Sequence, residues 1–496
     1  MKTDPDSSGT GGGAAADLLG EVMALRQAIA TEAGPWLAAH GAGSVPDPRL
    51  ANLAHYMALR RRDLRPLQRR LMRFGLSSLG RLEGRVLPTF DAVTVALSAI
   101  AGLPSPAALP REDAFFGGEA RLVDQTDALF GHGGTARRGR IMVTLPGSAA
   151  TDPAMILDLA RRGMDVARIN CAHDDRQSWR AIAANVRSAG EQLGRRLTVL
   201  MDVAGPKIRT GAVVPRKKAK VSVGDAVRLV AFGAPSARPD MPFCAAVSLP
   251  AIVERVRVGD RFRYDDGKME GVVEQVGSGE AVIRITQTKA GGTRLKAEKG
   301  INLPDTDLDL SPLTQKDDGD LATVVECADM VGYSFVSQAQ DIDLLEEALA
   351  RHGEGEKRLG IVAKIEQPRA VSNLPALIAR ALATGRPFGV MIARGDLAAE
   401  IGFERTAEMQ EEILWICEAA SVPTIWATQV LEDLVKDGLP SRGEMTDAAM
   451  AARAECVMLN KGPHVAKAVT LLDGMLARMD EHMFKKTATL RALKSW

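Results

Sequence analysis

Residues 140–203 read RIMVTLPGSAATDPAMILDLARRGMDVARINCAHDDRQSWRAIAANVRSAGEQLGRRLTVLMDV. Three apolar runs in this stretch, RIMVTL, DVARIN and LTVLMDV, have the length and composition of buried strands. The segments between them, Pro153–Arg162 and Gln177–Leu193, have apolar residues at helical spacing. Strands and helices that alternate in this way predict a parallel sheet covered by helices.

A segment of different character interrupts the alternation after the third strand. Residues 210–298 are rich in Val, Gly and Arg, and short alternating runs such as SVGDAVRLV lie between turn signals. This pattern predicts a small inserted β-barrel domain. The α/β pattern then resumes, and its five candidate strands are Met330–Ser334, Gly360–Ile365, Phe388–Ile392, Thr424–Ala427 and Cys456–Leu459. Three strands before the insertion and five after it predict an α/β fold of the (β/α)8 TIM-barrel type.

The first part of the chain lacks this alternation. Residues 50–72 and 76–100 have apolar residues at helical spacing, and Pro104 and Pro106 interrupt that pattern. We therefore expect a helical N-terminal extension that ends in a linker. The expected divisions are a disordered N-terminus at 1–16, the extension and linker at 17–136, the first part of the barrel at 137–209, the β domain at 210–298, the second part of the barrel at 299–486 and a tail at 487–496.

Composition excludes several classes of protein. The formal net charge of the 496 residues is +1, which argues against a nucleic-acid partner, and no run of 18 apolar residues predicts a membrane span. The five cysteines are scattered and form no CxxC pair, which argues against a disulfide framework or a zinc site and favours a reducing compartment.

The C-terminal ends of the strands carry the chemistry in a barrel of this kind. Charged and polar side chains gather at five of the eight expected strand ends. Those ends are Arg168–His173, Asp202–Arg209, Lys364–Glu366, Arg394–Asp396 and Ala427–Gln429.

The residue types at these ends favour phosphoryl transfer. Glu366 and Asp396 offer hard oxygen ligands from adjacent strands, which suit Mg²⁺ or Mn²⁺. Arg168 and Arg209 offer planar forks for phosphate oxygens. Lys364 can offset the negative charge of a phosphate or an enolate. Phosphoryl transfer requires a metal, fixed positive charge and accurate positioning of its reactants.

Seven segments resemble landmark sequences of the pyruvate kinase family, and they occur in that family's order. They are DVARINCAHD, VLMDVAGPKIRTG, KGINLPDTDLDL, GIVAKIEQP, VMIARGDLAAEI, TIWATQVLEDLV and PSRGEMTDAA. The resemblance spans about residues 140–486. It implies a phosphotransferase of glycolysis that passes the phosphoryl group of phosphoenolpyruvate to ADP, giving pyruvate and ATP. It also implies a cytoplasmic homo-oligomer.

The resemblance implies roles for the matching residues at the reacting centre. Lys364 matches the lysine that contacts the transferring phosphoryl group and stabilises the enolate, and Arg168 matches the arginine on that phosphoryl group. Glu366 and Asp396 match the ligands of the divalent metal. Thr428 matches the threonine near the enolate carbon, on the path of the proton.

Other matches imply where substrate, nucleotide and a monovalent cation would bind. Gly395, with Lys364, Asp396 and Thr428, belongs to the implied substrate site, and its lack of a side chain lets backbone amides approach an anion. Asp202 matches an acidic residue of the family's monovalent-cation site. The matches to the nucleotide-phosphate side are Asn170, His173, Arg209 and Lys299.

Departures from the family's pattern affect the expected cation requirement. Ala172 and Val203 stand where the family has Ser and Thr, so two side-chain oxygens expected around K⁺ are missing. Lys207 stands where K⁺-dependent members have a glutamate. We therefore expect that K⁺ is not required and that the ammonium of Lys207 substitutes for the monovalent cation.

Further departures leave two alternatives open. Asn460, Lys461 and Gly462 replace the family's Ser-Gly-Glu segment, and the family's C-terminal α/β domain is expected to be missing. One alternative is therefore a non-catalytic or regulatory relative that binds phosphoenolpyruvate or nucleotide. The other is a metal-dependent lyase of the pyruvate or enolate type.

Overall fold

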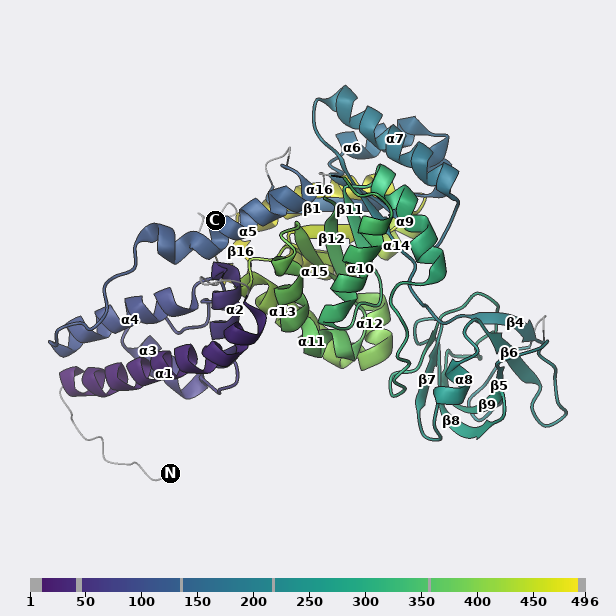
Figure 1. Ribbon diagram of the computed structural model, residues 1–496, viewed down its shortest axis with the longest axis horizontal. Helices are drawn as coiled ribbons and strands as arrows, with labels where there is room; N and C mark the ends of the chain where they lie inside the picture. The colour runs from purple at the N-terminus through teal and green to yellow at the C-terminus, as the bar shows by residue number, and fades with distance from the viewer. Residues whose placement is uncertain (1–10, 42–46, 134–136, 216–218, 356–357, 489–496) are drawn as a thin grey trace.

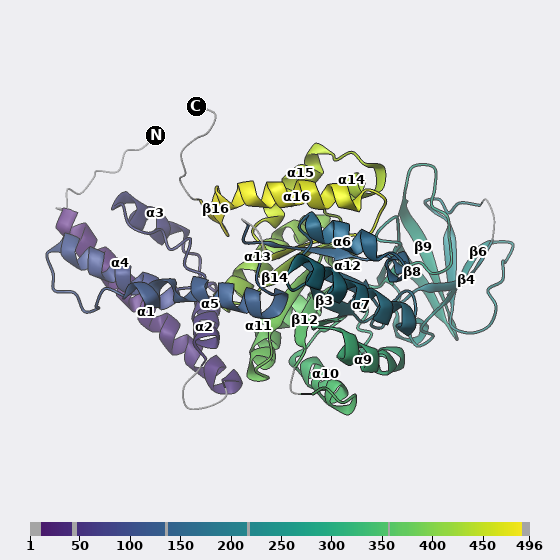
Figure 2. The same ribbon diagram turned by 90° about the horizontal axis from the view of Figure 1, so that it is seen from above.

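The computed structural model describes the whole chain except residues 1–10, 42–46, 134–136, 216–218, 356–357 and 489–496. A closed barrel of parallel strands lies between a helical extension on one side and a β-rich insertion on the other (Figures 1 and 2). The predicted fold class is therefore confirmed.

The eight barrel strands coincide with the eight predicted runs. Their order around the barrel is β1-β15-β14-β13-β12-β11-β3-β2, so each strand lies beside its neighbours in sequence and the ring closes between β1 and β15. The strands are β1 Arg140–Thr144, β2 Val166–Asn170, β3 Thr198–Asp202, β11 Met330–Tyr333, β12 Gly360–Ile365, β13 Phe388–Ala393, β14 Thr424–Ala427 and β15 Cys456–Leu459.

Helices cover the outside of the barrel, and local signals define where several of them begin. Asp152 accepts a hydrogen bond from the Met155 N–H at the start of α6 (Pro153–Arg161), and Ser441 caps α15 (Arg442–Ala451) in a capping box with Glu444. The other outer helices are α7 Arg176–Leu193, α9 Gln315–Cys327, α10 Ala339–Arg351, α11 Pro368–Ala383, α12 Arg394–Ile401, α13 Phe403–Ala419, α14 Glu432–Asp437 and α16 Val465–Asp480.

The insertion after β3 is a single seven-stranded sheet around its own apolar core. Its order is β10-β7-β8-β9-β5-β6-β4, and Arg209 and Gly300, which adjoin the two edge strands, form an antiparallel bridge. The sheet therefore curls toward the barrel shape that the sequence predicts. Its elements are β4 Thr210–Val214, β5 Ala226–Val230, β6 Phe243–Val247, α8 Ile252–Arg255, β7 Arg261–Tyr264, β8 Met269–Gly277, β9 Glu280–Thr288 and β10 Ile301–Asn302.

The extension is helical, but its limits differ from the predicted ones. Helix α1 begins at Gly11 and buries Ala15, so residues 11–16, which were expected to be disordered, are helical, and residues 1–10 lie outside the described residues. The expected linker contains α5, a helix of 19 residues. The helices are α1 Gly11–His40, α2 Pro48–Leu59, α3 Arg65–Arg73, α4 Val86–Ala101 and α5 Glu112–Phe130.

The predicted tail at 487–496 begins inside a short hairpin. Strand β16 (Met483–Phe484) pairs with β17 (Thr487–Ala488), and residues 489–496 lie outside the described part. No helix in the described part of the chain combines the length and the apolar character that crossing a membrane would require.

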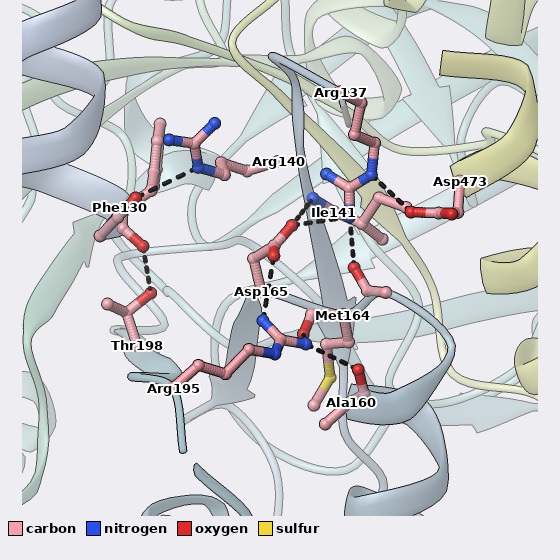
Figure 3. A network of polar contacts seen from close by, with 12 residues as sticks. Phe130, Arg137, Arg140, Ile141, Ala160, Met164, Asp165, Arg195, Thr198 and Asp473 are labelled. Atoms are coloured by element: carbon pink, nitrogen blue, oxygen red, sulfur yellow. Dashed lines mark hydrogen bonds and ion pairs between the residues drawn. The ribbon is translucent and has the colours of Figure 1, made fainter. Parts of the chain in front are cut away.

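The end of α5 closes the N-terminal end of the barrel. Leu129 and Phe130 are buried in a cluster with interior side chains of the barrel strands, and Phe130 O accepts a hydrogen bond from Thr198 Oγ1 at 3.2 Å. A buried ion-pair network continues from there (Figure 3). Arg137 lies 2.9 Å from Asp165 and 2.6 Å from Asp473, so the residue three positions before β1 is fixed to the barrel.

Candidate active site

The opposite, C-terminal end of the barrel holds the predicted reacting groups in one buried cluster. Arg168 Nε lies 2.9 Å from Asp202 Oδ2, and Lys364 Nζ lies 3.2 Å from Asp202 Oδ1. The same ammonium lies 3.0 Å from Glu366 Oε1. Asp202 and Glu366 are 1% and 2% exposed. The strands thus bring four predicted residues from β2, β3 and β12 into direct contact.

Asp202 and Lys364 keep one another ionised in this cluster. Burial opposes ionisation of Asp202, but Lys364 and Arg168 hold the pKa of that carboxyl below its ordinary value. Burial also opposes the charged form of Lys364, yet Asp202 and Glu366 raise the pKa of its ammonium. Lys364 is therefore a fixed positive charge inside the site.

Glu366 and Asp396 repel one another. Burial raises the pKa of Glu366, and the charge of Asp396 raises it further, against the opposing effect of Lys364. Glu366 Oε2 also accepts a hydrogen bond from the Phe335 N–H at 2.7 Å, which fixes the orientation of the carboxylate. Two neighbouring carboxylates of this kind favour a bound cation.

Lys207, the predicted substitute for a monovalent cation, pairs with Asp396. Its Nζ lies 2.6 Å from Asp396 Oδ1. The physical reason is that Arg168 and Lys364 already neutralise Asp202, whereas no other cation in the described part of the chain pairs with Asp396.

Ser334, which the sequence analysis did not select, completes the support of Lys364. Its hydroxyl donates to Val203 O at 2.6 Å and accepts from Lys364 Nζ at 2.7 Å. Because a hydroxyl has one proton, the bond to Val203 leaves only lone pairs for the ammonium. Ser334 directly follows β11, so the rule that strand ends carry the chemistry could have found it.

Thr428 directly follows β14 and has an unusual backbone. Its φ of 66° lies in the left-handed region, where a β-branched residue is a rare outlier. Its Oγ1 accepts a hydrogen bond from the Gly395 N–H at 2.9 Å, which joins two residues of the predicted substrate site.

The residues predicted on the nucleotide side come from two places: Asn170 and His173 lie at the end of β2, and Arg209 and Lys299 lie at the base of the β insertion. Arg209 and Lys299 occupy the two connecting segments, and Lys299 Nζ pairs with Asp265 at 3.2 Å. The pKa of His173 is lowered by the partial desolvation of its largely exposed ring and by the nearby charges of Lys461 and Arg209. Asn170 accepts a hydrogen bond from the backbone N–H two residues later at 3.0 Å. None of these four side chains contacts Arg168, Asp202, Lys364 or Glu366 through a hydrogen bond or ion pair in the described part of the chain.

A cleft of about 570 Å³ opens beside the cluster, between the base of the β insertion and the loops after β11 and β12. Lys207 and Phe335, which contact the two carboxylates Asp396 and Glu366, contribute to its lining. Glu400 also lines the cleft, and burial raises its pKa to about 7.

The segment that departs from the family's Ser-Gly-Glu pattern packs against α14. Asn460 Nδ2 donates to Glu432 Oε2 at 2.9 Å. A Cβ on Gly462 would lie 2.5 Å from Val435 Cγ1, so a side chain at that position requires α14 to move. The exposed Lys461 between them adds positive charge near His173.

The carboxylate pair fits a hard divalent cation that retains other ligands. In the described part of the chain, no three or more His, Cys, Asp or Glu side chains are grouped to hold a metal. Glu366 and Asp396 alone would leave positions for water and substrate oxygens, as Mg²⁺ sites commonly do.

The fold and this end of the barrel define a class of protein: a (β/α)8 barrel that combines paired carboxylates with a buried lysine and arginine. Residues 136–467 match the family model described as pyruvate kinase, barrel domain. This match covers more than half of the chain. The chain belongs to the pyruvate kinase family.

Individual relatives agree with the family model. A pyruvate kinase of Mycobacterium intracellulare is 33% identical over 337 residues, covering 67% of this chain and 67% of the relative. One of Agrobacterium vitis is 32% identical over 358 residues, covering 70% of each. The crystal structure of a pyruvate kinase from Cryptosporidium parvum matches with a TM-score of 0.62 and 26% identity, covering 70% of both chains.

Proposed function

We propose that the protein is a pyruvate kinase that transfers the phosphoryl group of phosphoenolpyruvate to ADP. The observation that carries this proposal is the position of Lys364, whose ammonium lies between Asp202 and Glu366 at the C-terminal end of the barrel. A positive charge fixed in this way stabilises an enolate as it forms, because no reorganisation is needed during the reaction.

Glu366 and Asp396 are the proposed ligands of Mg²⁺ or Mn²⁺. Burial raises the pKa of Glu366 and the charge of Asp396 raises it further, and a divalent cation between the two carboxylates would relieve both effects. When bound there, the ion would supply Lewis-acid stabilisation of negative charge on the substrate oxygens.

The remaining residues bind and orient the reactants. Arg168 is 9% exposed and is oriented by Asp202 and by the Thr144 hydroxyl, so its guanidinium has a defined direction for phosphoryl oxygens. Gly395 and Thr428 are proposed to contact phosphoenolpyruvate on the side where the enolate carbon takes its proton. Asn170, His173, Arg209 and Lys299 are the proposed contacts of the nucleotide phosphates.

Lys207 remains the proposed substitute for a monovalent cation, with one added step. A divalent cation at Asp396 would repel the ammonium that pairs with this carboxylate, and Lys207 would then be released toward the substrate phosphate. On this proposal K⁺ is not required for turnover.

The proposed setting of the reaction is the cytoplasm. All five cysteines are free thiols, and four of them are buried, which suits a reducing compartment.

The test is to incubate purified full-length protein with phosphoenolpyruvate, ADP and Mg²⁺ and to follow pyruvate and ATP together. Equal amounts of both products support the kinase. Binding of phosphoenolpyruvate without either product supports a regulatory relative, and pyruvate formed together with inorganic phosphate in the absence of ADP indicates a hydrolase.

A further inference from the structure

The segment after β14 holds Thr428 in a strained conformation. Thr428, Gln429 and Leu431 have φ values of 66°, 56° and 49°. A residue other than glycine is unfavourable in this region and persists only where its surroundings enforce it. Contacts that fix this segment therefore determine where the Thr428 hydroxyl lies.

Arg394, the first residue of α12, makes those contacts. Its Nε donates to Ala427 O at 3.0 Å, and its Nη2 donates to Thr428 O at 2.5 Å. The guanidinium carbon also lies 4.7 Å from the centre of the Trp426 ring. The planar guanidinium of Arg394 thus fixes the backbone carbonyls of two consecutive residues, Ala427 and Thr428.

Asp447 on α15 holds Arg394 in turn. Its carboxylate pairs with Nη1 and accepts from Nη2 at 2.9 Å. The two side chains are 12% and 27% exposed, so the pair is largely shielded from solvent. The geometry is that of a two-pronged arginine–carboxylate pair, which a lysine cannot reproduce.

The backbone of α12 fixes the Thr428 hydroxyl. Thr428 Oγ1 accepts from the Gly395 N–H, and Gly395 is the residue after Arg394. In the described part of the chain the hydroxyl donates to no protein group, so its own proton is free for water or substrate. The Arg394 side chain therefore fixes the carbonyl of Thr428, and the next residue of the same helix, Gly395, fixes its hydroxyl.

We propose that Arg394 and Asp447 are a positioning pair that holds Thr428 for protonation of the enolate carbon. This inference rests on the proposed function. In the step concerned, an O–H bond of a water beside Thr428 breaks, and its proton forms the new C–H bond with the electron pair of the enolate double bond. The enolate oxygen becomes a carbonyl, and the hydroxide left by the water takes a proton from bulk solvent. Arg394 touches none of the reacting atoms and acts only through Thr428.

The test separates protonation from phosphoryl transfer. With Mg²⁺ and ATP present, the exchange of pyruvate methyl protons with solvent deuterium reports the proton step alone. We expect Arg394→Lys and Asp447→Asn to slow this exchange about tenfold, with the KM for phosphoenolpyruvate changed less than about threefold.

Arg453→Lys is the matched control. Arg453 forms a two-pronged pair with Glu411 at 2.7 and 2.5 Å, with side-chain exposures of 10% and 22%, and it does not contact Thr428. If loss of a buried arginine pair acted only by loosening the barrel, this variant would slow exchange as much as Arg394→Lys, and the proposal would be overturned.

A double-mutant cycle completes the test. Because Arg394 acts through Thr428, Arg394→Lys should change exchange less than about twofold in a Thr428→Ala background. Full additivity of the two substitutions in an active enzyme would overturn the positioning role and leave the kinase proposal intact. A wild-type protein that neither forms pyruvate nor exchanges its protons would overturn both.

Discussion

Leu129→Ala tests whether the extension is an integral part of the barrel. Leu129 is 2% exposed and packs against the barrel strands at the end opposite the active site. A Cβ on Gly360 would lie 2.7 Å from Leu129 Cδ1, and one on Gly389 would lie 2.5 Å from Cδ2. The leucine thus fills a space made by two glycines on β12 and β13.

The expected cost lies in the upper part of the range for such substitutions. Core Leu→Ala changes cost about 2–5 kcal/mol, and the cost rises when the surroundings cannot collapse into the cavity. The strands around Leu129 are fixed by the closed ladder of the barrel. We therefore expect a loss of about 3–5 kcal/mol in the free energy of unfolding.

The assay is urea unfolding of the full-length variant beside the wild type and Leu109→Ala. Leu109 is 70% exposed, so its substitution should change the free energy of unfolding by less than about 0.5 kcal/mol. Turnover by folded Leu129→Ala should stay within about twofold of the wild type, since the site is at the other end of the barrel. A loss of stability below about 1 kcal/mol would refute the view that α5 closes the barrel.

Four further outcomes can be measured on the same protein. Lys364→Met should lower kcat by about 10²–10³ while circular dichroism stays unchanged, and an unchanged rate would rule out the proposed role of this ammonium. Glu366→Gln with Asp396→Asn should abolish both activity and the response to added Mg²⁺, and full activity of the wild type in excess chelator would contradict the metal site. Replacing K⁺ by a bulky quaternary ammonium at constant ionic strength should keep turnover within about threefold, whereas a tenfold fall would exclude Lys207 as the substitute. Burial raises the pKa of Glu418 to about 7, so the contribution of this carboxyl to stability is complete below its unfolded pKa and is lost as the pH rises through about 7. Glu418→Gln should therefore reduce the decrease in Tm over this pH range. An unchanged pH profile of Tm would show that Glu418 is not the group responsible.

The barrel was predictable because its strands are short, apolar and regularly alternated with helices. The limits of β12, β14 and β15 agree with the predicted runs to the residue. Helix α5 was not predictable in the same way, because prolines precede it and Gly117 and Gly118 interrupt its pattern. Gly118 has a tertiary cause, since a Cβ at that position would lie 2.1 Å from Gly84 O.

The candidate site was also predictable only in part. Glu366 and Lys364 could be selected because they end a strand at a spacing of two residues, which places both side chains on one face. The partner of Lys207 could not be predicted from the sequence. The choice between Asp202 and Asp396 depends on which of the two carboxylates other cations already neutralise. Asp447 could not be assigned to Arg394 either, since the two lie on separate helices 53 residues apart.

The central claim is that phosphoenolpyruvate and ADP react at Lys364. The most direct measurement follows ³¹P resonances of phosphoenolpyruvate, ADP and Mg²⁺ with wild-type protein and with Lys364→Met at equal concentration. We expect the wild type to convert the phosphoenolpyruvate signal into the γ-phosphate of ATP and the variant to do so at least about a hundredfold more slowly. Equal rates in the two proteins, or inorganic phosphate in place of ATP, would contradict the claim.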